Sequence, residues 1–291
     1  MFESIINPKK AERHPAEMFL IGFFYASLSM LIADVLFIGN NIFEEHLSLL
    51  IITFTVMFSS VFVYFTIRYE EKKDTYIQKE TSLLREHARA IMCFIYLFLG
   101  FVMAFSFAYV LLPQDIVNKN FDMQIKQFCD MNMPGQFTEC VDYHTTGKAV
   151  EPTSRVISSK PFNNALSIFS HNISVMIFCL LFSLLFGLGA IFILVWNASV
   201  IAVAMGIFAE SRLIDIPSSI LRYLIHGIPE IAAYFIIGLA GGIISVAVIR
   251  HDFRNHEFWR ILKDSLWLTL IAFIVLFLAA LIEVFITPAI F

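Results

Sequence analysis

The chain has 291 residues, of which 58% are hydrophobic and 15% are charged, and its mean hydropathy is +0.77. These values exclude a water-soluble globular protein, a disordered chain, a collagen and a disulfide-dense scaffold. The net charge of −4 provides no polybasic surface, so nucleic acid is excluded as a partner. Composition therefore predicts an all-α, polytopic membrane protein that is embedded in a lipid bilayer.

Uncharged apolar runs predict the membrane spans. A helix needs roughly 20 residues to cross about 30 Å of hydrocarbon, and six runs reach or approach that length, with Asp34 interrupting the first and Glu283 the last. The six runs are 18–38, 46–67, 90–112, 173–196, 231–249 and 265–287. A seventh apolar segment, 197–209, reaches only about 20 Å as a helix. This segment either crosses the membrane as a helix continued by part of 213–225, or it is a re-entrant hairpin. A re-entrant hairpin is tolerated only where protein or a water-filled cavity surrounds it.

Lysine and arginine residues predict the topology. All 20 lie outside the six runs, and thirteen of them fall in the three segments 9–13, 68–89 and 250–263. The positive-inside rule places these segments in the cytoplasm. Segment 197–209 must then reach the opposite side, because otherwise 250–263 would be external. We therefore expect seven membrane segments, a cytoplasmic N-terminus and an extracytoplasmic C-terminus.

The spans divide the chain into three regions. A three-span part occupies 1–112, an extracytoplasmic loop 113–160 and a C-terminal membrane core 161–291. Cys129 and Cys140 lie in the loop, where an oxidising compartment would favour a disulfide between them. Two free thiols are the alternative.

Two features concern helix placement in the C-terminal core. Segment 158–171 has apolar residues at 162, 165, 166 and 169, a spacing that predicts an amphipathic helix at the outer membrane interface. Asn197 begins the short segment and is placed to cap its N-terminus.

Small residues at helical spacing favour close helix packing in the same region. They are Gly187, Gly189, Gly206, Gly238 and Gly242. The last two form a GxxxG pair, which occurs by chance in apolar sequence. Packing within one chain is therefore favoured over dimerisation, although an oligomer is compatible with the pattern.

Ionisable side chains at membrane depth are expensive, so they are the first candidates for function. Gly227 permits a sharp turn and Pro229 suits the first position of a helix. This pattern predicts a helix break, with Glu230 in the first turn and His226 just before it. Glu283 lies close to the end of the last span, so we expect His226, Glu230 and Glu283 to share the outer third of the bilayer.

This polar group supports two interpretations. Histidine and carboxylates can bind a metal, relay protons or form an ionic lock. Alternatively, the two side chains have only a structural role: Glu230 caps backbone amides at the break, and His226 forms a hydrogen bond with a carbonyl group. No GxSxG, HExxH, Walker, CxxC or Rossmann motif occurs. The sequence therefore assigns no catalytic residue, metal or cofactor, and a non-enzymatic protein is favoured.

Several residues of the C-terminal half form a recognisable pattern. They are Asn163-Asn164, Asn172, Gly187-x-Gly189, Asn197, His226-Gly-Ile-Pro-Glu230 and Ile282-Glu283-x-Phe285-Ile286-Thr287-Pro288. This pattern resembles the stage II sporulation protein M family. The N-terminal half is similar to the longer archaeal members at residues 7–10, 14–19, 25–27, 70–73 and 84–87.

The resemblance implies a multi-pass protein of the plasma membrane with a five-span core and two additional N-terminal spans. In spore formers the family works with wall-degrading partners during engulfment, as a membrane-embedded organiser. An archaeal relative lacks that wall and those partners. Two functions therefore compete: an assembly factor whose outer loop recruits a membrane or extracytoplasmic protein, and a transporter or permease with a proton or substrate path near His226, Glu230 and Glu283.

Overall fold

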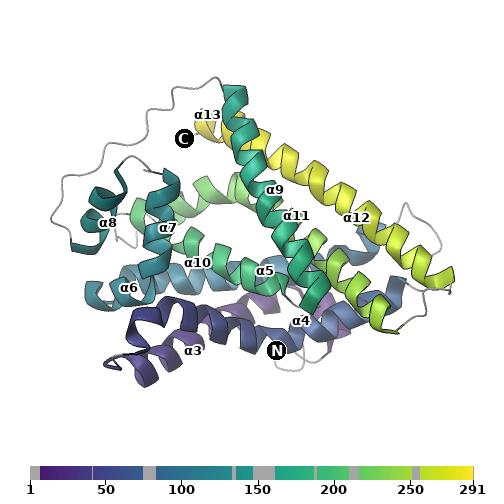
Figure 1. Ribbon diagram of the computed structural model, residues 1–291, viewed down its shortest axis with the longest axis horizontal. Helices are drawn as coiled ribbons and strands as arrows, with labels where there is room; N and C mark the ends of the chain where they lie inside the picture. The colour runs from purple at the N-terminus through teal and green to yellow at the C-terminus, as the bar shows by residue number, and fades with distance from the viewer. Residues whose placement is uncertain are drawn as a thin grey trace.

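The computed structural model is a bundle of long helices with a layer of short helices at one end (Figure 1). It describes residues 7–40, 42–74, 83–132, 136–146, 161–186, 189–209, 216–250 and 256–290. Within these ranges every regular element is a helix and none is a strand. The all-α fold is therefore confirmed.

Seven helices in the described part of the chain are long and apolar enough to cross a membrane. They are α3 (Glu17–Phe37), α4 (Leu47–Asp74), α5 (Leu83–Leu111), α9 (Pro161–Phe186), α10 (Ala190–Phe208), α11 (Ile216–Arg250) and α12 (His256–Leu281). The prediction of seven membrane segments is thus confirmed. On α12, large apolar side chains such as Leu266, Phe273 and Leu278 are exposed, as expected for a surface that faces lipid.

Shorter helices lie at the two ends of the bundle. The basic end gathers α2 (Pro8–Arg13), the end of α4 and the starts of α5 and α12. The opposite end carries the outer layer, which we define as α6 (Gln114–Asn120), α7 (Asp122–Asn132) and α8 (Phe137–Thr146) (Figure 1). The remaining elements are η1 (Glu44–His46), the π-helical turn η5 (Ile282–Ile286) and α13 (Thr287–Ile290).

The predicted boundaries of the fourth and fifth spans are wrong. The run 173–196 is divided between α9 and α10, and segment 197–209 is the second half of α10 rather than a short or re-entrant piece. Only three residues, all uncharged, separate the end of α9 from the start of α10. Because no charge marks this turn, hydropathy joins the end of one span to the start of the next.

The predicted interfacial helix is also corrected. Residues 161–171 are the first turns of α9, which continues into a candidate span at Ala165–Leu184, while 158–160 lie outside the described residues. The apolar spacing at 165 and 169 marks the side of α9 that packs into the bundle, where Ala165 and Phe169 are buried, and not a side that lies on the membrane surface. Asn172 of the same helix is also buried, at 6% exposure, and lies near Glu230 of α11.

Small residues bring the C-terminal helices into close contact. A Cβ on Gly189 would lie 2.7 Å from the carbonyl carbon of Phe182, and one on Gly238 would lie 2.9 Å from Cβ of Ala190. A side chain at Gly206 would overlap the Tyr109 ring. These contacts lie within one chain; Gly242 is buried, and Gly187 lies outside the described residues.

Asn197 does not cap a helix. It lies inside α10, where its side-chain amide donates a hydrogen bond to the Ile193 carbonyl over 2.7 Å. The predicted cap depended on a helix start that the structure places at Ala190. A local bond to the preceding turn satisfies this amide at membrane depth.

Candidate functional site

The residues Gly227 and Pro229 do not break a helix. They lie inside α11, which runs without interruption from Ile216 to Arg250. Proline removes one backbone donor, but membrane helices tolerate this loss where neighbouring helices surround the chain. Glu230 is therefore a residue of a helix interior and not of a first turn, which corrects its predicted capping role.

Glu230 accepts a side-chain hydrogen bond inside the bundle. The Tyr234 hydroxyl donates to its Oε1 over 2.8 Å, and the Asn172 side chain is a second partner. Asn172 lies nearer the middle than the end of the α9 span Ala165–Leu184. The placement of Glu230 in the outer third of the bilayer stays a prediction.

Glu283 approaches the same place from the other side. It belongs to the π-helical turn η5, and Glu230 is close enough to act on it electrostatically. His226 Nδ1 lies 3.2 Å from Thr287 Oγ1, just after η5. Local π-helix is frequent at functional sites. The structure thus brings His226, Glu230 and Glu283, which we call the α11 cluster, to one contact between α11 and the end of α12.

The chemistry open to the α11 cluster is limited by its surroundings. Among the described residues, no three His, Cys, Asp or Glu side chains are arranged to hold a metal ion. A small adjacent pocket of about 20 Å³ lies between α5, α10 and α11 and includes Gly227 and Ile228 in its wall. Its lining residues are Ile95, Phe98, Leu99, Val102, Ile201, Met205, Gly227, Ile228 and Ile231. This pocket offers no polar group, and none of the α11 cluster lines it.

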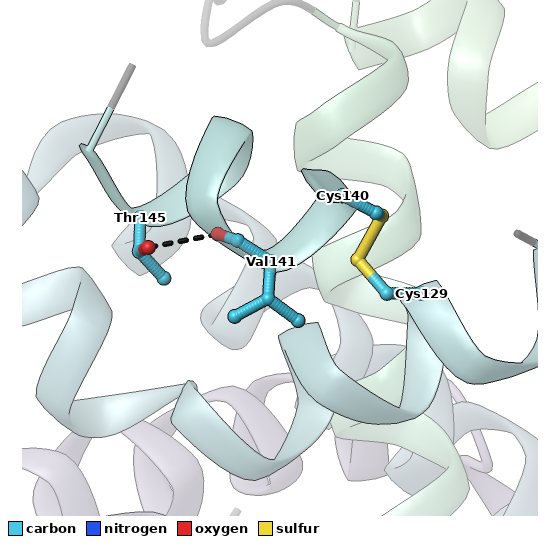
Figure 2. The surroundings of a disulfide bond; sticks show 4 residues. All are labelled: Cys129, Cys140, Val141 and Thr145. Atoms are coloured by element: carbon cyan, nitrogen blue, oxygen red, sulfur yellow. Dashed lines mark hydrogen bonds between the residues drawn. A yellow bond between two sulfur atoms is a disulfide. The ribbon is translucent and has the colours of Figure 1, made fainter. Parts of the chain in front are cut away.

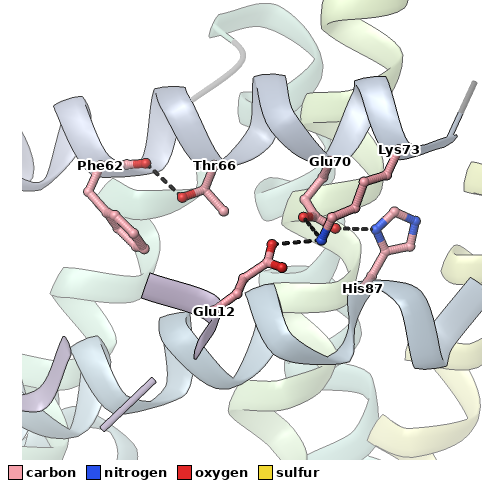
Figure 3. Close-up of polar contacts among 6 residues, drawn as sticks. All are labelled: Glu12, Phe62, Thr66, Glu70, Lys73 and His87. Carbon is pink, nitrogen blue, oxygen red and sulfur yellow. Dashed lines mark hydrogen bonds and ion pairs between the residues drawn. The ribbon is translucent and has the colours of Figure 1, made fainter. Parts of the chain in front are cut away.

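A second polar group, which the sequence did not single out as a site, lies at the basic end. Lys73 Nζ contacts Glu12 Oε1 and Glu70 Oε1, each at 2.7 Å, and Glu70 Oε2 lies 2.6 Å from His87 Nδ1. Figure 3 shows α2, α4 and α5 directing these four side chains to one point. The Glu70 and His87 side chains are 0% exposed. We call this group the basic-end cluster.

Sequence reasoning missed the basic-end cluster because acidic and basic residues beyond a span usually belong to a solvated face. The available signal was the spacing of Glu70 and Lys73, which lie three residues apart on α4. A histidine follows on the next helix. Only contacts between α2, α4 and α5 show that these charges are buried together.

Burial raises the pKa of Glu12 to about 7, and the neighbouring Glu70 carboxyl adds to this effect while Lys73 opposes it. A pKa above the ordinary value of 4.5 means that the folded protein binds this proton more tightly than the unfolded chain. The stability from Glu12 is therefore complete below pH 4.5 and is lost as the pH rises through about 7. We expect Glu12→Gln to flatten the stability profile over this interval. Thermal unfolding from pH 4 to pH 8 measures it, and an unchanged slope would contradict the assignment.

The outer layer is fastened to the bundle by its central helix α7. Phe128 of α7 packs against Phe208 of α10 at a ring separation of 6.1 Å. Gln124 Nε2 donates to Ser199 Oγ of α10 over 3.1 Å. The Cys129–Cys140 disulfide then joins α7 to α8 (Figure 2). The structure thus joins the pair that the sequence left open between a bridge and two free thiols.

The disulfide has a direct chemical test. The two cysteines are separated by 11 positions, and a closed loop of about this size is expected to contribute about 3 kcal/mol to folding. We expect mass spectrometry of unreduced peptides to recover Cys129 and Cys140 in one linked species. Recovery of both as free thiols from protein prepared without reductant would remove the bridge.

Comparison with known proteins supports the membrane assignment. The family model described as stage II sporulation protein M matches residues 16–288. An uncharacterised protein of Methanocaldococcus jannaschii is 35% identical over 132 residues, which cover 44% of this chain and 72% of that protein. No solved structure matches.

Proposed function

Because this chain belongs to the stage II sporulation protein M family, we propose that it is a non-enzymatic membrane protein that organises a complex through its outer layer. The partner is a polypeptide at the extracytoplasmic face, either soluble there or anchored in the same membrane. The observation that carries this proposal is the fixed attachment of α6, α7 and α8 to the bundle and to one another.

Several contacts support a rigid platform. Phe121, between α6 and α7, packs against the Phe105 and Tyr109 rings of α5 with centroid separations of 6.2 and 5.8 Å. Asn118 Nδ2 donates to the Thr145 carbonyl of α8 over 2.7 Å. A surface held in this way is preorganised, which lowers the entropy cost of binding a partner.

The outer layer also presents side chains suited to a protein contact. On α8, Phe137 is 38% exposed and lies beside the exposed residues Thr138 and Glu139. Cys140 follows them and is buried at the disulfide. An exposed aromatic residue on a fixed helix is a typical anchor of a protein interface.

A transporter is the second candidate, and the α11 cluster favours it. Intramembrane carboxylates mark proton and substrate paths in many carriers, and a π-helical turn at Glu283 adds to that pattern. The apolar lining of the adjacent pocket gives such a path no polar wall on that side. We therefore rank transport below organisation.

The proposed orientation places the basic end in the cytoplasm. Single cysteines at the exposed positions Glu45 and Asp130 should react with an impermeant maleimide added to intact cells. Cysteines at Lys72 and His256, exposed at the basic end, should react only after the membrane is opened. Labelling at His256 in intact cells would reverse the C-terminal half.

Photo-crosslinking in native membranes tests the proposed organiser. A photoreactive residue at Thr138 should give one discrete protein adduct, and Phe137→Ser should abolish it while the unfolding temperature is unchanged. The matched control is the same probe at Val35 of α3, which is 73% exposed on the membrane side and should give only lipid adducts.

If the protein is a transporter, a substitution at Glu230 should have the larger effect. Glu230→Gln would then abolish solute or proton flux into proteoliposomes while the protein stays folded, because glutamine keeps the shape and loses the charge. A Glu230-dependent flux, together with no protein adduct at Thr138, would overturn the organiser. Retention of the Thr138 adduct in Glu230→Gln would support it.

A further inference from the structure

Four polar residues line the junction between the outer layer and the bundle. Asp34 lies near the end of α3, Asn120 ends α6, Gln124 lies on α7 and Ser199 on α10. Asn120, Gln124 and Ser199 are each 1% exposed. Asn120 and Gln124 are four positions apart, one at the end of α6 and the other in the first turns of α7, and both are buried. We call these residues the acceptor seam.

The hydrogen bonds of the seam fix the orientation of both amides. Asn120 Nδ2 donates to Asp34 Oδ2 over 3.2 Å, and the reverse orientation would turn an amide oxygen towards the carboxylate. Ser199 donates its own hydroxyl proton to the Trp196 carbonyl over 2.7 Å. Ser199 Oγ can therefore only accept from Gln124, so Gln124 must present its NH2 group to it.

These orientations leave three oxygen acceptors in the seam. No donor among the residues that the structure describes reaches Asp34 Oδ1, Asn120 Oδ1 or Gln124 Oε1, and all three atoms are buried. A buried acceptor without a partner is costly. The three are carboxylate and amide oxygens, which are the ligand types that hard cations bind, and each amide uses its NH2 group in the hydrogen bond given above.

The surrounding charges also favour a cation. Asp34 lies in the last turn of α3, where the helix dipole is negative and disfavours an acid, and that turn contains no basic residue. Helix α6 also ends at the seam, at Asn120. The nearby Lys119 forms an ion pair with Glu44, and Lys126 pairs with Asp122 at 2.8 Å. The seam thus has one carboxylate and two helix ends of negative polarity.

We propose that the acceptor seam is a binding site for one monovalent cation, with sodium as the probe. A single carboxylate balances a single positive charge, whereas a divalent ion would leave net charge in a buried place. The bound cation joins α3 to α6 and α7, and so fastens the outer layer to the membrane core. This site stands whether or not the outer layer binds a protein partner.

The full-length protein in detergent tests the site directly. Equilibrium binding of radioactive sodium should approach one ion per chain. The unfolding temperature should rise to a plateau as sodium chloride replaces choline chloride at constant ionic strength. Asp34→Asn should abolish both responses. The matched control is Asp122→Asn, which removes a partly exposed carboxylate of the same layer and should keep both.

A second variant covers the case in which Asp34→Asn does not fold. Gln124→Glu adds a carboxylate to the seam and should create a stabilising response to calcium that the natural sequence lacks. Equal unfolding temperatures in sodium and choline, or a sodium response that survives Asp34→Asn, would overturn the proposal. Stabilisation of the natural sequence by calcium above that by sodium would overturn the monovalent assignment. A response to acid alone would assign the seam to a proton.

Discussion

Glu70→Ala is expected to destabilise the protein by about 3–5 kcal/mol, because it removes one partner from a buried ionic group. The Glu70 and His87 side chains are fully buried, with Glu70 Oε2 at 2.6 Å from His87 Nδ1. Lys73 also loses one of its two carboxylate contacts. The free energy of chemical unfolding in detergent micelles measures this loss.

A double substitution separates the charge effect from packing. Glu70→Leu together with His87→Phe replaces the buried pair by apolar groups and leaves the Lys73–Glu12 contact, which is 2.7 Å long. Apolar replacements of buried ion pairs are often neutral or stabilising. The double variant should therefore be more stable than the sum of the single changes predicts. Simple additivity would show that Glu70 and His87 do not act as a pair.

The seven spans could be predicted from sequence because lysine and arginine residues bracket most of them. The hairpin between α9 and α10 could not, since no charge separates its two helices and Gly189 allows a close approach to Phe182. Pro229 misled for a different reason. Proline usually ends a helix in water, but α11 continues through it, where neighbouring membrane helices surround the chain.

The polar sites, too, could be predicted from the sequence only in part. His226, Glu230 and Glu283 could be predicted to lie near one another because their spans run antiparallel, yet the hydrogen bond that Glu230 accepts from Tyr234 depends on α11 continuing as a helix through Pro229. The basic-end cluster depends on three helices meeting around Lys73. Burial of a charge is a property of such contacts, and hydropathy along one segment does not contain it.

The crossing of α3 and α5 provides the second large expected effect. A Cβ on Gly100 would overlap the Phe19 carbonyl oxygen and lie 2.7 Å from the Phe23 backbone nitrogen. Gly22 faces Leu97 at the same crossing in the same way. Backbone atoms cannot move aside as a flexible side chain can. We therefore expect Gly100→Ala to cost about 1–3 kcal/mol by overpacking, and Gly100→Leu to prevent the two helices from packing.

Gly227→Ala is the matched control for this prediction. It makes the same change inside a membrane helix, but nothing lies within 4 Å of the added Cβ. Alanine is the better helix former by about 0.5–1 kcal/mol, so Gly227→Ala should be neutral or stabilising. Opposite signs for the two glycines in chemical unfolding would show that close contact sets the result. Equal stability of Gly100→Ala and the natural sequence would contradict the close crossing of α3 and α5.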